Sequence, residues 1–157
     1  MNVITGFAVV VVLVPSAPAL KDGSDQTAIQ GEWEVVACTI HGHKMPQEQV
    51  GQLKVTIVGD KFQLSPMPQI VIGLPKGVTF TFTPGVVDYR FLLEGKSGTK
   101  SIELSWTGHG ETQLLQGIYR LERERMVICY SERDRPKDFQ SSETDGTWKF
   151  ELRRARR

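Results

Sequence analysis

Three histidines are the residues of this sequence best suited to binding a metal ion. His41 and His43 are two positions apart, a spacing that places both imidazoles on one face of an extended strand. A catalytic zinc site needs three protein ligands, and His109 is the remaining histidine. All three lie beside glycines in segments that we expect to be turns, and they can meet only if those turns share one end of the fold. We interpret them as exposed turn residues and predict no metal site.

The two cysteines, Cys38 and Cys129, lie near the beginning and near the end of the chain. Their segments become neighbours if a sheet closes into a barrel, and an exported protein can form disulfides. The alternative is a pair of buried thiols that act as small apolar side chains. We favour the buried thiols.

No arrangement typical of an enzyme occurs in the sequence. Five carboxylates lie between positions 132 and 145, but three basic residues are interleaved with them, which is typical of solvated ion pairs. The chain has no Gly-x-Ser-x-Gly elbow, phosphate-binding loop or dinucleotide fingerprint. We therefore predict a non-enzymatic protein without catalytic residues or a cofactor.

The composition is that of an ordinary globular domain. The chain has 157 residues, a formal net charge of +1, 39% hydrophobic residues and 24% charged residues. This length predicts one domain. The arginine-rich end of the chain forms a basic tail at 155–157, but no aromatic residues are interleaved with it. We expect a monomer that does not bind nucleic acid.

The first nineteen residues differ from the rest. An apolar run at 3–14 is followed by prolines and by Ala17-x-Ala19. The run is shorter than the ~20 residues that a membrane-spanning helix requires. It predicts a signal peptide over 1–19 and an exported chain, periplasmic or extracellular, with a wrong start codon or a buried first strand as alternatives. Residues 20–28 are polar and are expected to form a flexible lead-in.

The remaining sequence predicts short strands and no long helix. The first strand covers 31–39, with Trp33, Val35 and Ala37 on its buried face. A loop is expected at 65–77, because its prolines exclude a central strand. Further strands are expected at 53–58, 61–64, 78–83, 86–94, 100–107, 113–122, 126–131 and 147–154. Their spacing predicts an all-β fold, an up-and-down antiparallel barrel of about eight strands, with a β-sandwich as the alternative.

Several short motifs occur in a characteristic order. They are IQGEWEVV at 29–36, GDKF at 59–62, GIYRL at 117–121, ICY at 128–130, Arg135-Pro136 and LRR at 152–154. Together they resemble an uncharacterised lipocalin-like domain family that is abundant in exported proteins of planctomycete bacteria. The resemblance spans 29–154 and implies a lipocalin-like barrel, but the family has no assigned activity.

The wider lipocalin resemblance implies a structural anchor at one end of the barrel. In such barrels the tryptophan of a Gly-x-Trp motif closes one end, and an arginine of the last strand stacks on its ring. Trp33 is that tryptophan. The alternation of the last strand places Arg154 on the same face as Trp148 and Phe150, so Arg154 is the expected partner and Arg153 the alternative.

One apolar segment suggests a function. Ile70, Val71 and Ile72 lie in the proline-flanked loop, where they could form a lid over a ligand cavity or pack into a small core of their own. Hydrogen-bonding groups inside such a cavity would come from the hydroxyls of three tyrosines, Tyr89, Tyr119 and Tyr130. We expect an exported binding module for a small apolar or amphipathic ligand. The alternative is a filled barrel whose outer surface binds a protein or polysaccharide of the cell envelope.

Overall fold

The computed structural model describes residues 23–73, 77–95, 100–108 and 110–156. The expected signal peptide over 1–19 and His109 lie outside these ranges. Two short helices are present in the described part, α1 (Gly23–Ala28) and α2 (Gln47–Val50). The strands are β1 (Gly31–Ile40), β2 (His43–Lys44), β3 (Lys54–Val58), β4 (Lys61–Ser65), β5 (Met67–Gly73), β6 (Gly77–Thr83), β7 (Val87–Glu94), β8 (Lys100–Gly108), β9 (Glu111–Glu122), β10 (Arg125–Ser131) and β11 (Thr147–Arg154).

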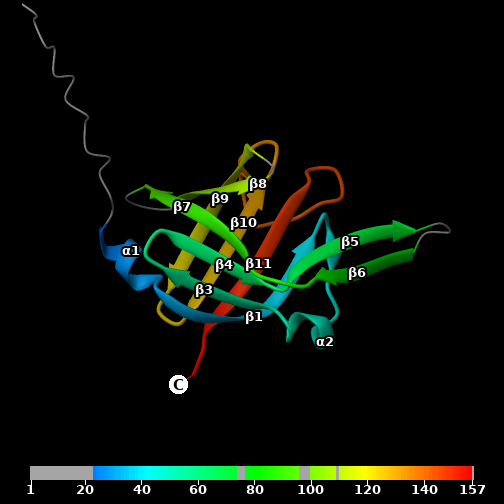
Figure 1. The fold of residues 1–157 in the computed structure, drawn as a ribbon, viewed down its shortest axis with the longest axis horizontal. Coiled ribbons are helices and arrows are strands. Elements are labelled where there is room, and N and C mark those ends of the chain that lie inside the picture. Colours follow the sequence, from blue (N-terminus) through cyan, green and yellow to red (C-terminus); the bar gives the residue numbers. More distant parts are fainter. Residues whose placement is uncertain (1–22, 74–76, 96–99, 109, 157) are drawn as a thin grey trace, which may run out of the picture.

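Eight of the strands close into an antiparallel barrel. Neighbours pair in the order β1, β3, β4, β7, β8, β9, β10 and β11, and β11 pairs back with β1 (Figure 1). Closure leaves no free sheet edge in the barrel wall. The prediction of an all-β, lipocalin-like up-and-down barrel is confirmed, and the sandwich alternative is excluded.

A β-bulge changes the inward face of β1. Val35 pairs with Leu152 and Ala37 pairs with Glu151, so Val36 is an extra residue on the β1 side. Beyond the bulge the inward positions are Cys38 and Ile40, which are 1% and 0% exposed. The prediction that Ala37 lies on the buried face is therefore wrong.

Side chains from all eight barrel strands occupy the interior. One from each strand, in barrel order, is Trp33, Val55, Phe62, Phe91, Leu104, Tyr119, Ile128 and Phe150, and each is at most 7% exposed. Burial of a large apolar side chain contributes about 1.5–3 kcal/mol, so this layer is the main source of stability. The described inward side chains thus form a packed core.

One end of the barrel is sealed around Trp33. The Arg154 guanidinium carbon lies 4.1 Å from the centroid of the Trp33 ring, the arrangement that strand alternation predicts. The same guanidinium donates hydrogen bonds to the carbonyl oxygens of Gln30 (2.5 Å) and Ala28 (2.6 Å). Gly31 (φ 115°) lets the guanidinium approach, because a Cβ there would lie 3.2 Å from it. Arg153 faces outward and pairs with Glu34 at 2.7 Å.

Helix α1 lies against the same end. Residues 23–28, expected to be a flexible lead-in, form this helix because Asp25 is fixed from two directions. Its carboxylate accepts hydrogen bonds from Tyr119 Oη at 2.7 Å and from Lys100 Nζ at 2.5 Å. The Trp33 indole N–H donates to the Ile29 carbonyl at 2.8 Å, just beyond the helix. These contacts tie the lead-in to the barrel.

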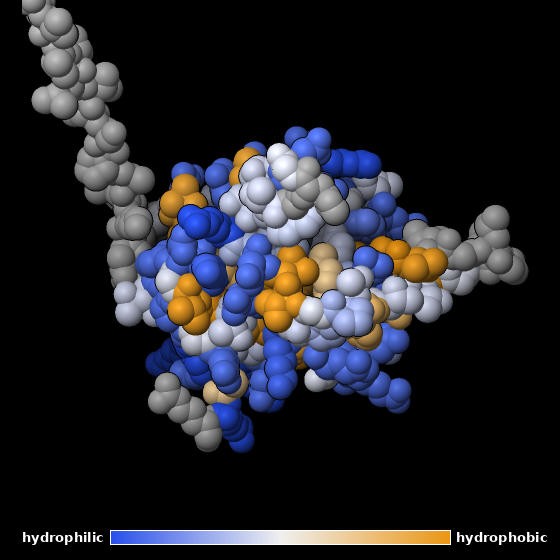
Figure 2. Space-filling view, in the orientation of Figure 1, coloured by the Kyte–Doolittle hydropathy of each residue, from blue (hydrophilic) through white to orange (hydrophobic). Residues whose placement is uncertain are grey.

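Strands β5 and β6 form a separate two-stranded sheet that projects from the barrel between β4 and β7 (Figure 1). The expectation of a loop over 65–77 is wrong for β5. Pro68 is accommodated because β5 pairs with β6 alone and is not a central strand. Val71 and Val78 are 50% and 38% exposed, and Figure 2 shows hydrophobic surface along this hairpin.

The segment 132–146 covers the outer face of β8, β9 and β10. Within it, the Arg135 guanidinium donates a hydrogen bond to the Glu103 carboxylate of β8 at 3.1 Å. The guanidinium carbon of Arg120 in β9 lies over the Phe139 ring, 5.0 Å from its centroid. The Gln140 carbonyl accepts from the Cys129 thiol of β10 at 3.6 Å. Cys129 is therefore buried on the outside of the wall, while Cys38 is buried inside. Both thiols are free, as we favoured, because the wall separates them.

Candidate ligand-binding sites

The barrel end opposite α1 is bordered by the β5–β6 hairpin, and we call it the mouth. β1 begins beside α1, so the antiparallel order places the ends of β8 and β10 and the beginnings of β7 and β11 at the mouth. Several apolar side chains at these strand ends and on the hairpin pack against the core without being fully buried. This mouth cluster consists of Met67, Ile70, Phe82, Val87, Trp106 and Trp148. It is a partly open apolar surface of the kind that ligands cover.

Stacked aromatic rings form one side of the mouth. Tyr130 stacks on Trp148, with ring centroids 6.1 Å apart and planes 11° apart, and on Phe150 at 5.9 Å and 18°. His41 meets Trp148 edge-on at 6.1 Å. Aromatic pairs of this kind contribute about 0.5–1.5 kcal/mol beyond simple burial, so the stacking stabilises this side of the mouth.

The hydroxyl group of Tyr130 is buried and has no hydrogen-bond partner within the described structure. The nearby Tyr89 hydroxyl reaches only the Met67 sulfur, at 3.8 Å. Burial, helped by the charge of Glu132, raises the pKa of Tyr89 to about 12 and that of Tyr130 well above its usual value. Both phenols are therefore neutral at neutral pH, and the hydrogen-bonding capacity of the buried Tyr130 hydroxyl is unused among the described residues.

The other ligand-binding candidates occupy different places. Ile70 belongs to the mouth cluster, but Val71 points to solvent. The side chain of Ile72 lies outside the described ones. Tyr119 is at the sealed end, where it is bonded to Asp25, so it is not a hydrogen-bonding group at the mouth.

Sequence reasoning missed the other members of the mouth cluster. The tryptophans at 106 and 148 each lie near the mouth end of a strand, and a large aromatic residue near a strand end is the signal that could have identified them. Phe82 and Met67 could not be identified in this way, because the hairpin that carries them was not expected.

The histidines do not form a metal site in the described part of the chain. His43 Nε2 lies 3.5 Å from a Glu143 carboxylate oxygen, and the His41 ring packs on Trp148. No cluster of three metal-ligating side chains occurs among the described residues. The 41–43 turn instead joins the 132–146 segment, since the Gly42 amide donates to Ser141 Oγ at 2.9 Å.

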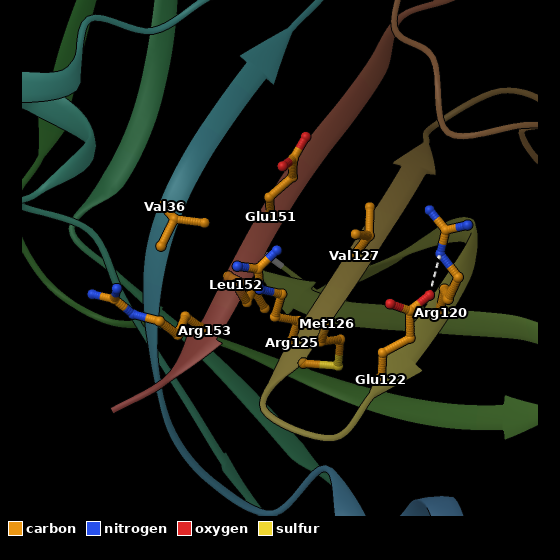
Figure 3. A pocket seen from close by; sticks show the side chains of 9 residues that line it. All are labelled: Val36, Arg120, Glu122, Arg125, Met126, Val127, Glu151, Leu152 and Arg153. Carbon is orange, nitrogen blue, oxygen red and sulfur yellow. Dashed lines mark ion pairs between the residues drawn. The ribbon is translucent and has the colours of Figure 1, made fainter. Parts of the chain in front are cut away.

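A second hollow lies on the outer wall, across β1, β11, β10 and β9 (Figure 3). This outer groove has a volume of about 410 Å³. Val36 and Val127 line its floor, and Figure 3 shows Arg125 between Arg153 on one side and Arg120 on the other. Its acidic lining residues are Glu122 and Glu151.

The carboxylates of the outer groove are already engaged. Glu122 pairs with Arg120 at 3.4 Å, and Glu151 pairs with Lys149 at 2.8 Å. Arg153 is held by Glu34 outside the groove. Among the lining residues of the groove, the Arg125 side chain has no ion pair or hydrogen bond with any described residue, although Glu122 is its register partner on β9.

Within the described residues, no helix is long and apolar enough to cross a membrane. Comparisons with protein-family models, curated proteins and solved structures found no match. The geometry of the mouth and of the outer groove is therefore the basis for a functional assignment.

Proposed function

We propose that this protein is an exported, non-enzymatic binding module that takes a small apolar or amphipathic ligand at the mouth of its barrel. The observation that carries the proposal is the half-buried mouth cluster next to the unpartnered Tyr130 hydroxyl. An apolar surface with one convergent polar group is the usual make-up of a small-molecule site. The exported location rests on the leader pattern at 1–19 alone.

The packed interior restricts where the ligand lies. Side chains such as Phe62, Phe91 and Phe150 occupy the barrel, so a long chain cannot run along its axis without displacing them. A ligand that covers roughly 200 Å² of apolar surface at the mouth gains about 5 kcal/mol before the cost of association. A ring system or the end of an acyl chain is large enough for this.

The hairpin supports access to the mouth. β5 and β6 pair only with each other, so a movement of the hairpin breaks no hydrogen bond of the barrel wall. Ile70 and Phe82 belong to the hairpin and to the mouth cluster at once. A ligand that slides between hairpin and barrel would therefore contact both.

The experiment is a titration of the chain from residue 20 onward with an environment-sensitive fluorescent fatty acid. We expect saturable binding that unlabelled amphiphiles compete away. Ile70→Ser should weaken binding at least fivefold, whereas Val71→Ser, a matched change on the solvent side of the same strand, should leave it within twofold. Absence of binding at every concentration below aggregation, or equal effects of the two variants, contradicts the proposal.

The alternative is a barrel whose outer surface binds a partner in the cell envelope. One specific observation favours it, the outer groove with its unpaired Arg125.

A further inference from the structure

We propose that the outer groove binds an acidic peptide segment of a partner protein, with a carboxylate of that segment on Arg125. This site is on the outside of the wall and is separate from the mouth. It does not depend on the proposed small-molecule function.

The fold places two arginines directly opposite each other at this groove. Arg125 of β10 is the register partner of Arg153 of β11 on one side and of Glu122 of β9 on the other, and both arginines are exposed on the outer face. Glu122 is paired with Arg120 and Arg153 with Glu34, so Arg125 is left without an ion pair among the described residues. Like charges in directly opposite positions of an antiparallel pair are destabilising. An anionic group bound between them relieves that repulsion.

Further arginines lie next to the pair. Arg123 occupies the two-residue turn between β9 and β10, and Arg156 follows the end of β11. The two segments are adjacent, because the Arg154 amide donates to the Glu124 carbonyl at 2.8 Å. Neither Arg123 nor Arg156 has a side-chain ion pair within the described residues. The edge of the groove therefore carries two unpaired arginines beside Glu124, which pairs with Arg154 at 3.8 Å.

The turn itself is strained. Arg123 has a φ of 48°, a left-handed conformation that asparagine and glycine adopt more easily in hairpin turns of this length. A side chain with a Cβ costs roughly 1–2 kcal/mol there. Residues in sparsely populated backbone conformations cluster at functional sites; Arg123 shares this conformation with His41, and its place at the end of the groove supports a functional role for this edge.

The lining of the groove favours a peptide over a uniform polyanion. Glu122 and Glu151 lie within the groove and would repel the regularly spaced charges of a nucleic acid, an acidic polysaccharide or an anionic bilayer. A peptide can place one carboxylate on Arg125 in the bidentate geometry that guanidinium favours, and an apolar side chain on Val36 and Val127. Its neighbouring residues can avoid the two glutamates.

The test is fluorescence anisotropy with a labelled peptide in which glutamates flank two leucines. A matched peptide has glutamine in place of every glutamate. We expect saturable binding of the glutamate peptide at low ionic strength and at least tenfold weaker binding of the glutamine peptide. Arg125→Gln should weaken binding of the glutamate peptide at least fivefold. Arg125→Lys should weaken it by less, because lysine keeps the positive charge and loses only the bidentate hydrogen bonding of the guanidinium.

The matched control is Lys61→Gln, which also removes one exposed positive charge. Lys61 lies on β4, four strands from β10 in either direction around the barrel, and should leave affinity within twofold. The fatty-acid titration should be unchanged in Arg125→Gln, which separates the two sites. Equal losses in Arg125→Gln and Lys61→Gln, no binding of the glutamate peptide, or tighter Arg125-dependent binding of heparin or phosphatidylglycerol vesicles overturns the proposal.

Discussion

Replacement of Tyr130 by phenylalanine should make the protein more stable and a weaker binder. The Tyr130 side chain is 2% exposed and its hydroxyl has no partner among the described residues. A buried polar group without a hydrogen bond costs about 1–3 kcal/mol. Phenylalanine keeps the ring stacked against both Trp148 and Phe150, so packing is preserved. We expect the free energy of unfolding to rise by about 1–2 kcal/mol.

The expected shift in melting temperature follows from the size of the domain. A domain of about 130 residues has an unfolding entropy of roughly 0.27 kcal/mol/K near 60 °C, so a gain of 1–2 kcal/mol raises the melting temperature by about 4–7 °C. Differential scanning calorimetry measures this directly. The same variant should bind the fluorescent fatty acid several-fold more weakly, because the polar end of the ligand loses its partner.

The matched control is Tyr89→Phe. The Tyr89 hydroxyl already contacts the Met67 sulfur at 3.8 Å, so its removal should produce a smaller gain in stability. An unchanged or lower melting temperature in Tyr130→Phe would show that the folded protein satisfies this hydroxyl. Higher stability with unchanged affinity would show that the ligand does not use it.

Three other predictions test the stability of the barrel that carries these sites. Trp33→Ala should lower the free energy of unfolding by about 3–5 kcal/mol, measured by urea denaturation, because it removes a side chain that is 1% exposed; exposed Val58→Ala is the control, and equal effects would contradict the anchor. Although burial raises the pKa of Asp25, hydrogen bonds from Lys100 and Tyr119 outweigh it and lower the pKa below 3.8. The stability that this carboxylate contributes is thus complete above about pH 4 and lost as the pH falls further, so Asp25→Asn and the native chain should converge in acid. Burial raises the pKa of Cys38 and Cys129 to about 12, so a thiol reagent at pH 8 should label both only after denaturation, and rapid labelling of the folded protein would refute their burial.

Alternation of apolar and polar residues predicts most of the barrel because each regular strand has one buried face. The strand expected at 78–83 agrees with β6, and the strand expected at 147–154 agrees with β11. Regular alternation along β11 is also why Arg154, and not Arg153, could be assigned to the Trp33 ring. Local pattern is sufficient where no bulge interrupts the strand.

Tertiary pairing decided the features that the sequence did not predict. The bulge at Val36 exists in the pairing of β1 with β11, more than a hundred positions away, and nothing local marks it. Strand β5 contains Pro68, which argues against a central strand but not against a two-stranded hairpin. Local sequence also could not decide between a disulfide and two free thiols, because the bulge determines the face of β1 on which Cys38 lies.

Both proposed sites coincide with a local conflict in the folded chain. The barrel interior is packed with apolar side chains, yet Tyr130 holds an unpartnered hydroxyl next to the mouth. On the outer wall, Arg125 faces Arg153 on one side and Glu122 on the other, and it has no ion pair among the described residues. Natural sequences depart from such local rules mainly at functional sites. Since a hydrogen-bonding amphiphile would resolve the first conflict and a carboxylate the second, the two ligands differ in chemistry and each site can be removed without affecting the other.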